Sequence, residues 1–521
     1  MSPTAETYKR AKQRVGKVSL ATKIFQAIGA VPESLKNFAF GTFVLLFYNQ
    51  VLGANAFYVS LCLAAALTID AAFDPLIGSF SDGLRTPLGR RHLLMYLSAA
   101  PIGLGLFLVF SPPHAVAGAG LYAWLFATVI LTNISMSLFV VPWTALFAEF
   151  TDDYVERTTI VTWRYIVGWV IPTAFTFATY ALIFPNTRAH PVGQLNPAGY
   201  HLFGPVVALA TVAAILATTE LTRREIPYLL QPTNPTPRFS LAQVWRDIAS
   251  TRANRDFLIL FCGALLYAAV DGTTGTLGIY MGTYFWGLTS AQLQWFSLTI
   301  IGAVVAFASL NVVGRLFDKR SVLLTSFALI VIFGMGVTSL RLLHLMPPNG
   351  SGLLLMLLIG NETIRAGLGV FLGIMFVSML ADTIDVQELA TGRRQEGLFA
   401  AALSFSGKAT AGLGTVVAGF LLQEVVHWPA RVDPRSVDQP LVMRLALVAG
   451  VLVPVLYAIP FCLGFFLRIT RETHQRTLEQ LERRRAAAHV TAGEDQGAQD
   501  QGALAEGLEV AMEAATEATG R

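Results

Sequence analysis

Long apolar runs alternate with short polar loops along most of this chain. A helix needs about 20 apolar residues to cross the roughly 30 Å of hydrocarbon in a bilayer. Twelve runs are long enough, at residues 26–52, 57–82, 93–111, 119–149, 161–186, 201–221, 257–286, 291–316, 322–343, 352–381, 396–425 and 441–469. The pattern predicts an all-α membrane protein with twelve transmembrane helices.

A polar, proline-containing stretch at residues 222–256 divides these runs into two sets of six. It predicts a cytoplasmic linker between an N-terminal six-helix bundle (26–221) and a C-terminal one (257–469). Residues 1–25 are a polar, basic N-terminal segment in which we expect no cleaved signal peptide. Residues 470–521 are a cytoplasmic tail that we expect to be largely disordered after a first helix-prone part.

The two halves share a weak internal sequence repeat. Gly78-x-x-x-Asp82 at the end of the second run returns as Gly314-x-x-x-Asp318 at the end of the eighth, and basic residues follow both. One short match is a weak signal. Its equivalent position in each half nevertheless favours a duplicated architecture of the kind that transporters use.

Composition supports a bilayer location and excludes an ordinary soluble domain. Charged residues make up 13% of the 521 residues, about half of what soluble domains carry. Lysine and arginine gather in alternate loops, so the positive-inside bias places both termini in the cytoplasm of a multi-pass protein of the inner or plasma membrane. This distribution is a topology signal and gives no support for a nucleic-acid partner. Three widely separated cysteines, Cys62, Cys262 and Cys462, offer neither a metal spacing nor an obvious disulfide.

Two aspartates lie inside the second apolar run. Asp70 and Asp74 are four residues apart, so on a helix their carboxylates share one face, about 5–6 Å apart. An acid at the bilayer centre costs roughly 2.5–3.5 kcal/mol even on insertion scales. Such a pair is best stabilised by a wet cavity and a shared cation, so we interpret it as an ion-binding site with Na⁺ as one candidate ligand.

Other ionisable groups at membrane depth allow a structural or a functional interpretation. Glu362 and Arg365 are three residues apart and can simply neutralise each other, and Arg164 can extend its charge to the interface. Asp271 has no partner nearby in the sequence, which slightly favours substrate or proton binding. Lys408 lies in a helix of small residues, where a cation needs an acid partner, and the two aspartates of the second run are its candidates.

Polar and aromatic side chains at the same depth leave similar alternatives open. Ser137, Thr144 and Ser404 can supply oxygen ligands, although hydrogen bonds between helices are the commoner use. Five tryptophans can stack on a sugar ring or anchor helices at the membrane interface, the second being the default. They are Trp143, Trp163, Trp169, Trp286 and Trp295.

The charged and proline-containing motifs occur in a distinctive order. They are Asp70-x-x-x-Asp74-Pro75 with Gly78, Gly89-Arg90-Arg91, Pro142 leading to Glu156-Arg157 and Arg164, Ala381-Asp382-x-x-Asp385-x-x-Glu388 with Arg394-x-Glu396, and Lys408. As a set they resemble the glycoside-pentoside-hexuronide:cation symporter family, the melibiose permease branch of the major facilitator superfamily. The resemblance covers about residues 25–468.

The resemblance implies a fold, a mechanism and an ion site. It implies twelve helices in two bundles, alternating access and transport driven by Na⁺ or H⁺. It further implies that Asp70, Asp74 and Ser137 bind the cation, that Lys408 is a coupling residue beside them, and that Arg164 approaches the substrate cavity. We interpret the charged residues in the basic loops as an inner gate, formed by Asp82, Arg90, Arg91, Asp382, Asp385 and Arg394.

The chain departs from the sugar-transporting members of this family at the substrate positions. The helix-four aspartate of those members falls near Val140 here and its tryptophan neighbour near Thr144. Their helix-one aspartate falls around Ser34 or Asn37, and a helix-ten tryptophan near Gly373. Loss of both acids removes hydroxyl acceptors, and Gly373 enlarges the cavity. We place these positions at the substrate cavity together with Arg164, Asp271, Glu362 and Ser404.

These observations favour a cation-coupled symporter of a glycoside or related small sugar. The alternative is a lysophospholipid or other amphiphile carried on the same fold, and a distant one is a membrane sensor without transport. An enzyme is not expected, because no nucleophile with its base and no metal-ligand set lies at membrane depth. We expect a monomer in the lipid bilayer with no cofactor, whose partners are a small-molecule substrate and a coupling ion, Na⁺ or H⁺.

Overall fold

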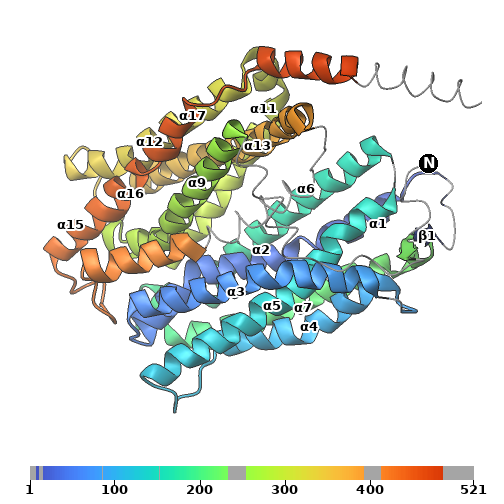
Figure 1. Ribbon diagram of the computed structural model, residues 1–521. Helices are drawn as coiled ribbons and strands as arrows, with labels where there is room; N and C mark the ends of the chain where they lie inside the picture. The colour runs from blue at the N-terminus through green and yellow to red at the C-terminus, as the bar shows by residue number, and fades with distance from the viewer. Residues whose placement is uncertain are drawn as a thin grey trace, which may run out of the picture.

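The computed structural model describes residues 8–10, 14, 16–84, 86–151, 153–232, 254–391 and 412–484, which are helical apart from one pair of three-residue strands (Figure 1). Ten of its helices are long and apolar enough to cross a membrane. They are Ala56–Gly83, Gly89–Val109, Ala119–Phe150, Val155–Ile183, Pro197–Tyr228, Arg255–Phe285, Ser290–Leu316, Lys319–Leu342, Gly352–Leu389 and Gln439–Gly464. The prediction of an all-α multi-pass membrane protein is confirmed, while the count of twelve spans stays a prediction.

The first apolar run is a broken helix and not the single one that its length suggested. It comprises α1 (Leu20–Ile28), α2 (Val31–Phe38), η1 (Ala39–Val44) and η2 (Phe47–Val51). The break has a local cause. The indole of Trp143 donates from Nε1 to the carbonyl of Gln26 at 2.8 Å, and any side chain at Gly29 would overlap its ring. Pro32 in the first turn of α2 starts the helix again after this insertion.

The N-terminal half packs five further helical segments against this broken one. They are α3 (Ala56–Gly83), α4 (Gly89–Val109), α5 (Ala119–Phe150), α6 (Tyr154–Ala178) continued by η3 (Thr179–Ile183), and α7 (Pro197–Thr222). Helix α4 lies against α5 and α7, α3 lies against α5, and α1 and α2 lie against α6 and α7. Side-chain caps at Asn55, Asp153 and Asn196 begin three of these helices by accepting from free N–H groups of the first turn.

The C-terminal half repeats this arrangement with α9 (Arg255–Tyr280), η7 (Met281–Phe285), α10 (Ser290–Leu293), η8 (Gln294–Thr299), α11 (Ile300–Leu316), α12 (Lys319–Leu342) and α13 (Gly352–Thr391). A helix at Gly412–Val425, which ends in η9 (Leu421–Val425), follows. The last segments are α15 (Gln439–Leu447), η10 (Val448–Leu452), α16 (Val453–Val455) and α17 (Ala458–Gly464). Helices α11 and α13 approach closely at Gly302. Its lack of a side chain allows this, since a Cβ atom there would overlap the Thr363 carbonyl.

Short elements complete the described chain. They are η4 (Gly193–Leu195), η5 (Arg223–Tyr228), the antiparallel pair of β1 (Tyr8–Arg10) and β2 (Leu230–Pro232), and a helix at residues 471–484. In Figure 1, α3, α4, α5 and α7 lie in the lower part of the molecule and α9, α12 and α13 in the upper part. Most of the predicted linker, residues 233–253, lies outside the described residues.

Four helices end in the same wide turn. In η2, η3, η7 and η9, the N–H of the residue that follows the turn donates to the carbonyl five residues earlier, at 2.9–3.1 Å. By chain direction all four turns lie at one end of the molecule, which we call the junction end. The opposite end, which carries Arg90, Arg91 and Lys319, is called the basic end. The wide turns occur in the first helical run of each half and in a later helix of each half. They are therefore a second feature that is repeated between the halves.

The junction end joins the two halves by direct hydrogen bonds. Gln50 accepts from the Tyr284 hydroxyl at 2.8 Å and from the Val432 N–H at 3.0 Å, and its amide donates to the Pro429 carbonyl at 3.1 Å. Gln194 donates to Thr283 at 3.0 Å and accepts from Ser290 at 2.6 Å. Further hydrogen bonds that join described residues of the two halves lie at this same end.

Candidate cation and substrate sites

A buried carboxylate and a hydroxyl from two different helices meet in the N-terminal half. Asp70 on α3 is 2% exposed, and Ser137 on α5 donates from Oγ to its Oδ1 at 2.7 Å. Asp74 lies one turn further along α3 and is half-buried. The structure thus brings together two of the three residues that the sequence assigned to the ion, and places the third on the same helix.

The chemistry of this site suits a small hard cation. An ionised carboxylate held away from water needs compensation by a cation, a proton or hydrogen-bond donors. Carboxylate and hydroxyl oxygens are the ligands that such cations prefer. Pro75 interrupts the backbone of α3 beside Asp74, and because proline has no N–H, the carbonyl of Ala71 lacks its usual helical donor. Oxygen atoms are therefore concentrated along this part of α3.

The helix at Gly412–Val425 packs directly on α3 close to this site. A Cβ atom added at Gly412 would lie 3.3 Å from Leu67 Cδ1, and one at Gly419 would overlap the Ser60 side chain. Leu67 is three residues before Asp70, which places the start of the described helix next to the carboxylate pair. Lys408 and Ser404, which the sequence assigned to coupling and to the substrate cavity, lie outside the described residues.

At the basic end, a charged cluster joins three helices of the N-terminal half. Asp82 lies 2.6 Å from Arg91 Nη2 and 3.7 Å from Arg90 Nη1. Both arginines also contact Glu149 Oε1, at 2.8 Å for Arg90 and 3.0 Å for Arg91, and Ser81 accepts from Arg91 at 2.9 Å. Asp82 and the two arginines were expected here from the sequence. Glu149 was missed, because the sequence shows only an acidic residue at the expected cytoplasmic end of the fourth apolar run.

The C-terminal half carries a related cluster. Lys319 at the start of α12 lies 2.7 Å from Asp382 near the end of α13, much as the arginines at the start of α4 reach Glu149 near the end of α5. Asp385 is 3.0 Å from His474 of the helix at residues 471–484. Asp318, the counterpart of Asp82, instead caps α12 by accepting from the Arg320 N–H at 3.2 Å. Arg394 lies outside the described residues.

Between the two halves lie two cavities of about 560 and 700 Å³ that share part of their walls. The first, which we call the polar lobe, includes hydroxyl and amide side chains among its lining residues, such as Thr42, Thr173, Thr274 and Asn361. The second, the apolar lobe, is lined mainly by aliphatic and aromatic residues such as Phe307, Ile330, Ile374 and Val377. Both volumes fall in the range of small-molecule sites.

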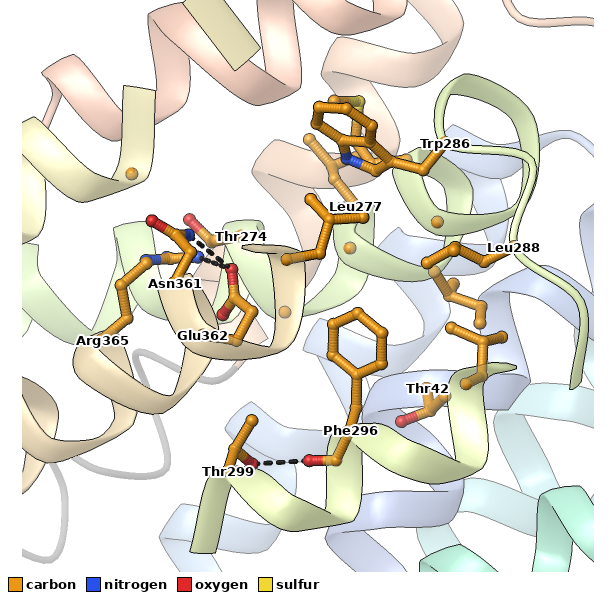
Figure 2. A pocket seen from close by; sticks show the side chains of 18 of the residues that line it. Thr42, Thr274, Leu277, Trp286, Leu288, Phe296, Thr299, Asn361, Glu362 and Arg365 are labelled. Carbon is orange, nitrogen blue, oxygen red and sulfur yellow. Dashed lines mark hydrogen bonds and ion pairs between the residues drawn. The ribbon is translucent and has the colours of Figure 1, made fainter. Parts of the chain in front are cut away.

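The two lobes meet at three ionisable residues, which we call the charged neck: Asp271, Glu362 and Arg365. Arg365 Nη1 contacts Glu362 Oε1 at 2.7 Å, so this pair is the local neutralisation that its spacing allowed. Figure 2 shows both side chains beside Asn361, whose amide donates to Glu362 at 3.4 Å. Asp271 accepts at Oδ1 from the Tyr457 hydroxyl at 3.2 Å and is itself exposed to the cavity.

The cavities include some of the predicted substrate residues and omit others. Asp271 and Glu362 line both lobes, and Gly373 lines the apolar lobe, where a Cβ atom added to it would have no other atom within 4 Å. The remaining described candidates do not line either cavity. Arg164 lies over the Trp143 ring at 3.9 Å, and the Ser34 hydroxyl donates to the carbonyls of Ala30 and Gly168. The Thr144 hydroxyl donates to carbonyls of its own helix, Val140 packs on the core, and Asn37 is exposed.

Several cavity residues were not singled out for this role from the sequence. Tyr457, Thr274 and Asn361 gave no signal, because which face of an apolar helix meets the other half cannot be seen in its composition. Trp169 and Trp286 line the polar lobe, and Trp169 the apolar lobe as well. On sequence grounds anchoring is the default use of such tryptophans, but the position of these two makes them available for stacking on a sugar.

The sequence matches a model of the family described as MFS/sugar transport protein over residues 25–471. A Bacillus subtilis protein named uncharacterized symporter YnaJ is 24% identical over 91% of this chain and 96% of its own. The putative glycoside/cation symporter YagG of Escherichia coli is 24% identical over 85% of this chain and 90% of its own. The isoprimeverose transporter of Lactiplantibacillus pentosus is 23% identical over 73% and 75%.

Other similarities cover a smaller part of the chain or concern the fold alone. A sodium-dependent lysophosphatidylcholine symporter 1 from Xenopus tropicalis is 28% identical, but over 30% of this chain and 31% of its own. Among solved structures, the nucleoside transporter NupG matches with a TM-score of 0.56 at 14% identity, over 86% of this chain and 98% of that one. This structural likeness supports the helical architecture.

Proposed function

The chain belongs to the MFS/sugar transport protein family, and from this membership we propose that it is a cation-coupled symporter of a glycoside or related small sugar. The family and the similar proteins are transporters and not enzymes. The observation that carries the proposal is the combination of a cavity between the halves with a separate, buried carboxylate–hydroxyl pair on α3 and α5. The protein is a multi-pass protein of the cell membrane.

The ion is bound, in this proposal, by Asp70, Asp74 and Ser137, and is Na⁺ or H⁺. The hydrogen bond from Ser137 to Asp70 and the burial of both groups support this assignment, because they hold oxygen atoms where a cation is needed. Lys408 is the coupling residue. It lies four residues before Gly412, which packs beside Leu67, so it is close in sequence to a segment that contacts α3 near the ion site.

Transport would proceed by alternating access of two six-helix bundles, with the junction end outside the cell and the basic end and both termini in the cytoplasm. The hydrogen bonds of Gln50 and Gln194 close the junction end. The clusters around Glu149 and Asp382 would act as parts of an inner gate at the basic end. Each chain holds both halves of the cavity, which supports a monomer as the transporting unit.

A lysophospholipid or another amphiphile is the second candidate substrate. The local similarity to a sodium-dependent lysophosphatidylcholine symporter and the apolar lobe favour it. The glycoside is preferred, because the similar proteins that match most of the chain carry the names of sugar or glycoside transporters. Threonine and asparagine side chains in the polar lobe also suit the hydroxyl groups of a sugar.

Ligand-dependent thermal stabilisation of the purified protein tests this proposal. A ligand present at 100 times its dissociation constant stabilises the native state by about 2.7 kcal/mol, which is readily measured. Glycosides and lysolipids are screened with and without Na⁺ at two pH values. A shift with a glycoside that Na⁺ or acid pH enhances is expected, whereas a shift with lysolipids alone would replace the sugar by an amphiphile.

A further inference from the structure

Resting on the proposed function, we infer that this protein selects an amphipathic glycoside and holds it in one orientation. The sugar ring occupies the polar lobe toward the junction end, and an apolar aglycone of about the size of an aromatic ring occupies the apolar lobe toward the basic end. The polar groups of the sugar are held chiefly by the C-terminal half.

The two lobes lie one after the other along the same three helices, α6, α9 and α13. Going from the basic end toward the junction end, the lining moves from residues 165–169 to 169–180 on α6 and η3, and from 267–271 to 271–282 on α9 and η7. On α13, which runs the other way, it moves from 362–377 to 358–365. The lobes are therefore stacked along the membrane normal, and one extended molecule can occupy both.

The charged neck fits neutral hydroxyls better than an anionic group. Arg365, the one cation among the described lining residues, already contacts Glu362 at 2.7 Å. When Asp271 is ionised, the neck has one negative charge in excess, which disfavours a carboxylate or phosphate on the substrate. Tyr457 bonds Asp271 at Oδ1, so the exposed carboxylate keeps acceptor capacity for sugar hydroxyls.

Two side chains of the polar lobe carry polar atoms without a partner. Asn361 Oδ1 and Arg365 Nε are enclosed by protein and have no partner among the described residues, although other atoms of both side chains line the polar lobe. Buried polar groups normally have partners, so a small rotation of either side chain toward a ligand hydroxyl would be favoured. Figure 2 shows Asn361 together with Glu362 and Arg365, and its dashed lines mark the contacts of Asn361 and Arg365 with Glu362.

The described walls of the apolar lobe are mostly aliphatic and aromatic, and beyond the neck their polar atoms are mainly the hydroxyls of Tyr165, Tyr267 and Thr299. Beyond the neck, α13 contributes Val370, Gly373, Ile374 and Val377, and Phe307 of α11 lies across from them. A polar group there would lose its hydration, whereas burial of an aromatic ring is favourable by an amount that corresponds to about a 10- to 100-fold gain in affinity. Gly373 leaves open space in this wall, which a larger side chain would occupy.

Matched pairs of methyl and phenyl glycosides of glucose, galactose and xylose test the inference by calorimetry on the purified full-length protein. We expect at least one phenyl glycoside to bind 10- to 100-fold more tightly than its methyl counterpart. Gly373→Leu is expected to abolish this preference by weakening phenyl glycoside binding more than methyl glycoside binding. Gly360→Leu is the matched control: it lies on the same helix, has open space around its Cβ position and lines neither lobe.

The outcomes separate this inference from the proposed function. If glycosides bind but the methyl and phenyl forms have equal affinities, or if Gly373→Leu weakens both forms equally, the two-lobe assignment is wrong and the sugar symport proposal stands. If no glycoside of either series binds, the proposed function fails first. Tighter binding of lysophosphatidylcholine than of every phenyl glycoside would overturn the inference in favour of a lipid.

Discussion

Gln50 joins the two halves at the junction end, and its replacement by alanine should open that end. It makes three hydrogen bonds to the other half, with Tyr284, Val432 and Pro429, at 2.8–3.1 Å. All three partners belong to the C-terminal half, so these bonds exist only while the end is closed. Gln50→Ala therefore destabilises the closed form relative to the open one.

The size of the effect follows from the number of bonds. A hydrogen bond within a protein contributes about 0.5–1.5 kcal/mol net, so three contribute about 1.5–4.5 kcal/mol. Water that enters the space left by the side chain can satisfy part of the loss, which places the expected change at about 1.5–3 kcal/mol. The ratio of open to closed molecules should rise roughly 10- to 150-fold.

Pulsed electron paramagnetic resonance can measure this shift. His114 and Arg435 are exposed on loops of opposite halves at the junction end, and spin labels at these positions report their separation once the three native cysteines are replaced. Gln50→Ala should increase the long-distance population, while Gln439→Ala, at an exposed glutamine of the same end, should not. Identical distance distributions in Gln50→Ala and the unsubstituted protein would refute the reasoning.

Three further predictions concern the ion site, the coupling residue and the basic end. Asp74→Asn should abolish ion-driven accumulation in proteoliposomes while the thermal unfolding temperature stays near its original value; normal accumulation would remove Asp74 from the ion site. Lys408→Ala should lower the accumulation ratio or stop transport, and an unchanged ratio would make this lysine structural. Glu149→Gln leaves two buried arginines with one acid fewer and should destabilise the protein by up to about 3 kcal/mol, whereas Glu472→Gln, in a pair that is about 70% exposed, should cost less than about 1 kcal/mol; equal melting temperatures would contradict this.

The sequence predicted best where burial of charge is costly. Asp70 and the pair of Glu362 with Arg365 could be singled out because an ionised group in an apolar helix needs a partner within a narrow distance. Helix spacing alone supplies the partner for Glu362. The contact between Asp70 and Ser137 joins two helices, and it was expected only through the family resemblance.

The walls of the cavity were harder to predict. Ser34, Val140 and Thr144 were proposed by position along a family pattern, but a helix turns by about 100° per residue, so a small shift in register or rotation directs a side chain elsewhere. The break at Gly29 depends on an indole from α5, a contact between residues more than 110 positions apart in the chain. Such long-range packing leaves no local signal in the sequence.

The proposed ion site and the ionisable residues of the cavity lie in different halves, which affects how this protein can change over evolution. Asp70 and Ser137 lie on α3 and α5, whereas Asp271, Glu362 and Arg365 lie on α9 and α13. On the proposed assignment, mutations in α13 would alter which substrate is carried without touching the ion site. A duplicated gene could then evolve a new substrate specificity while it keeps the same coupling ion.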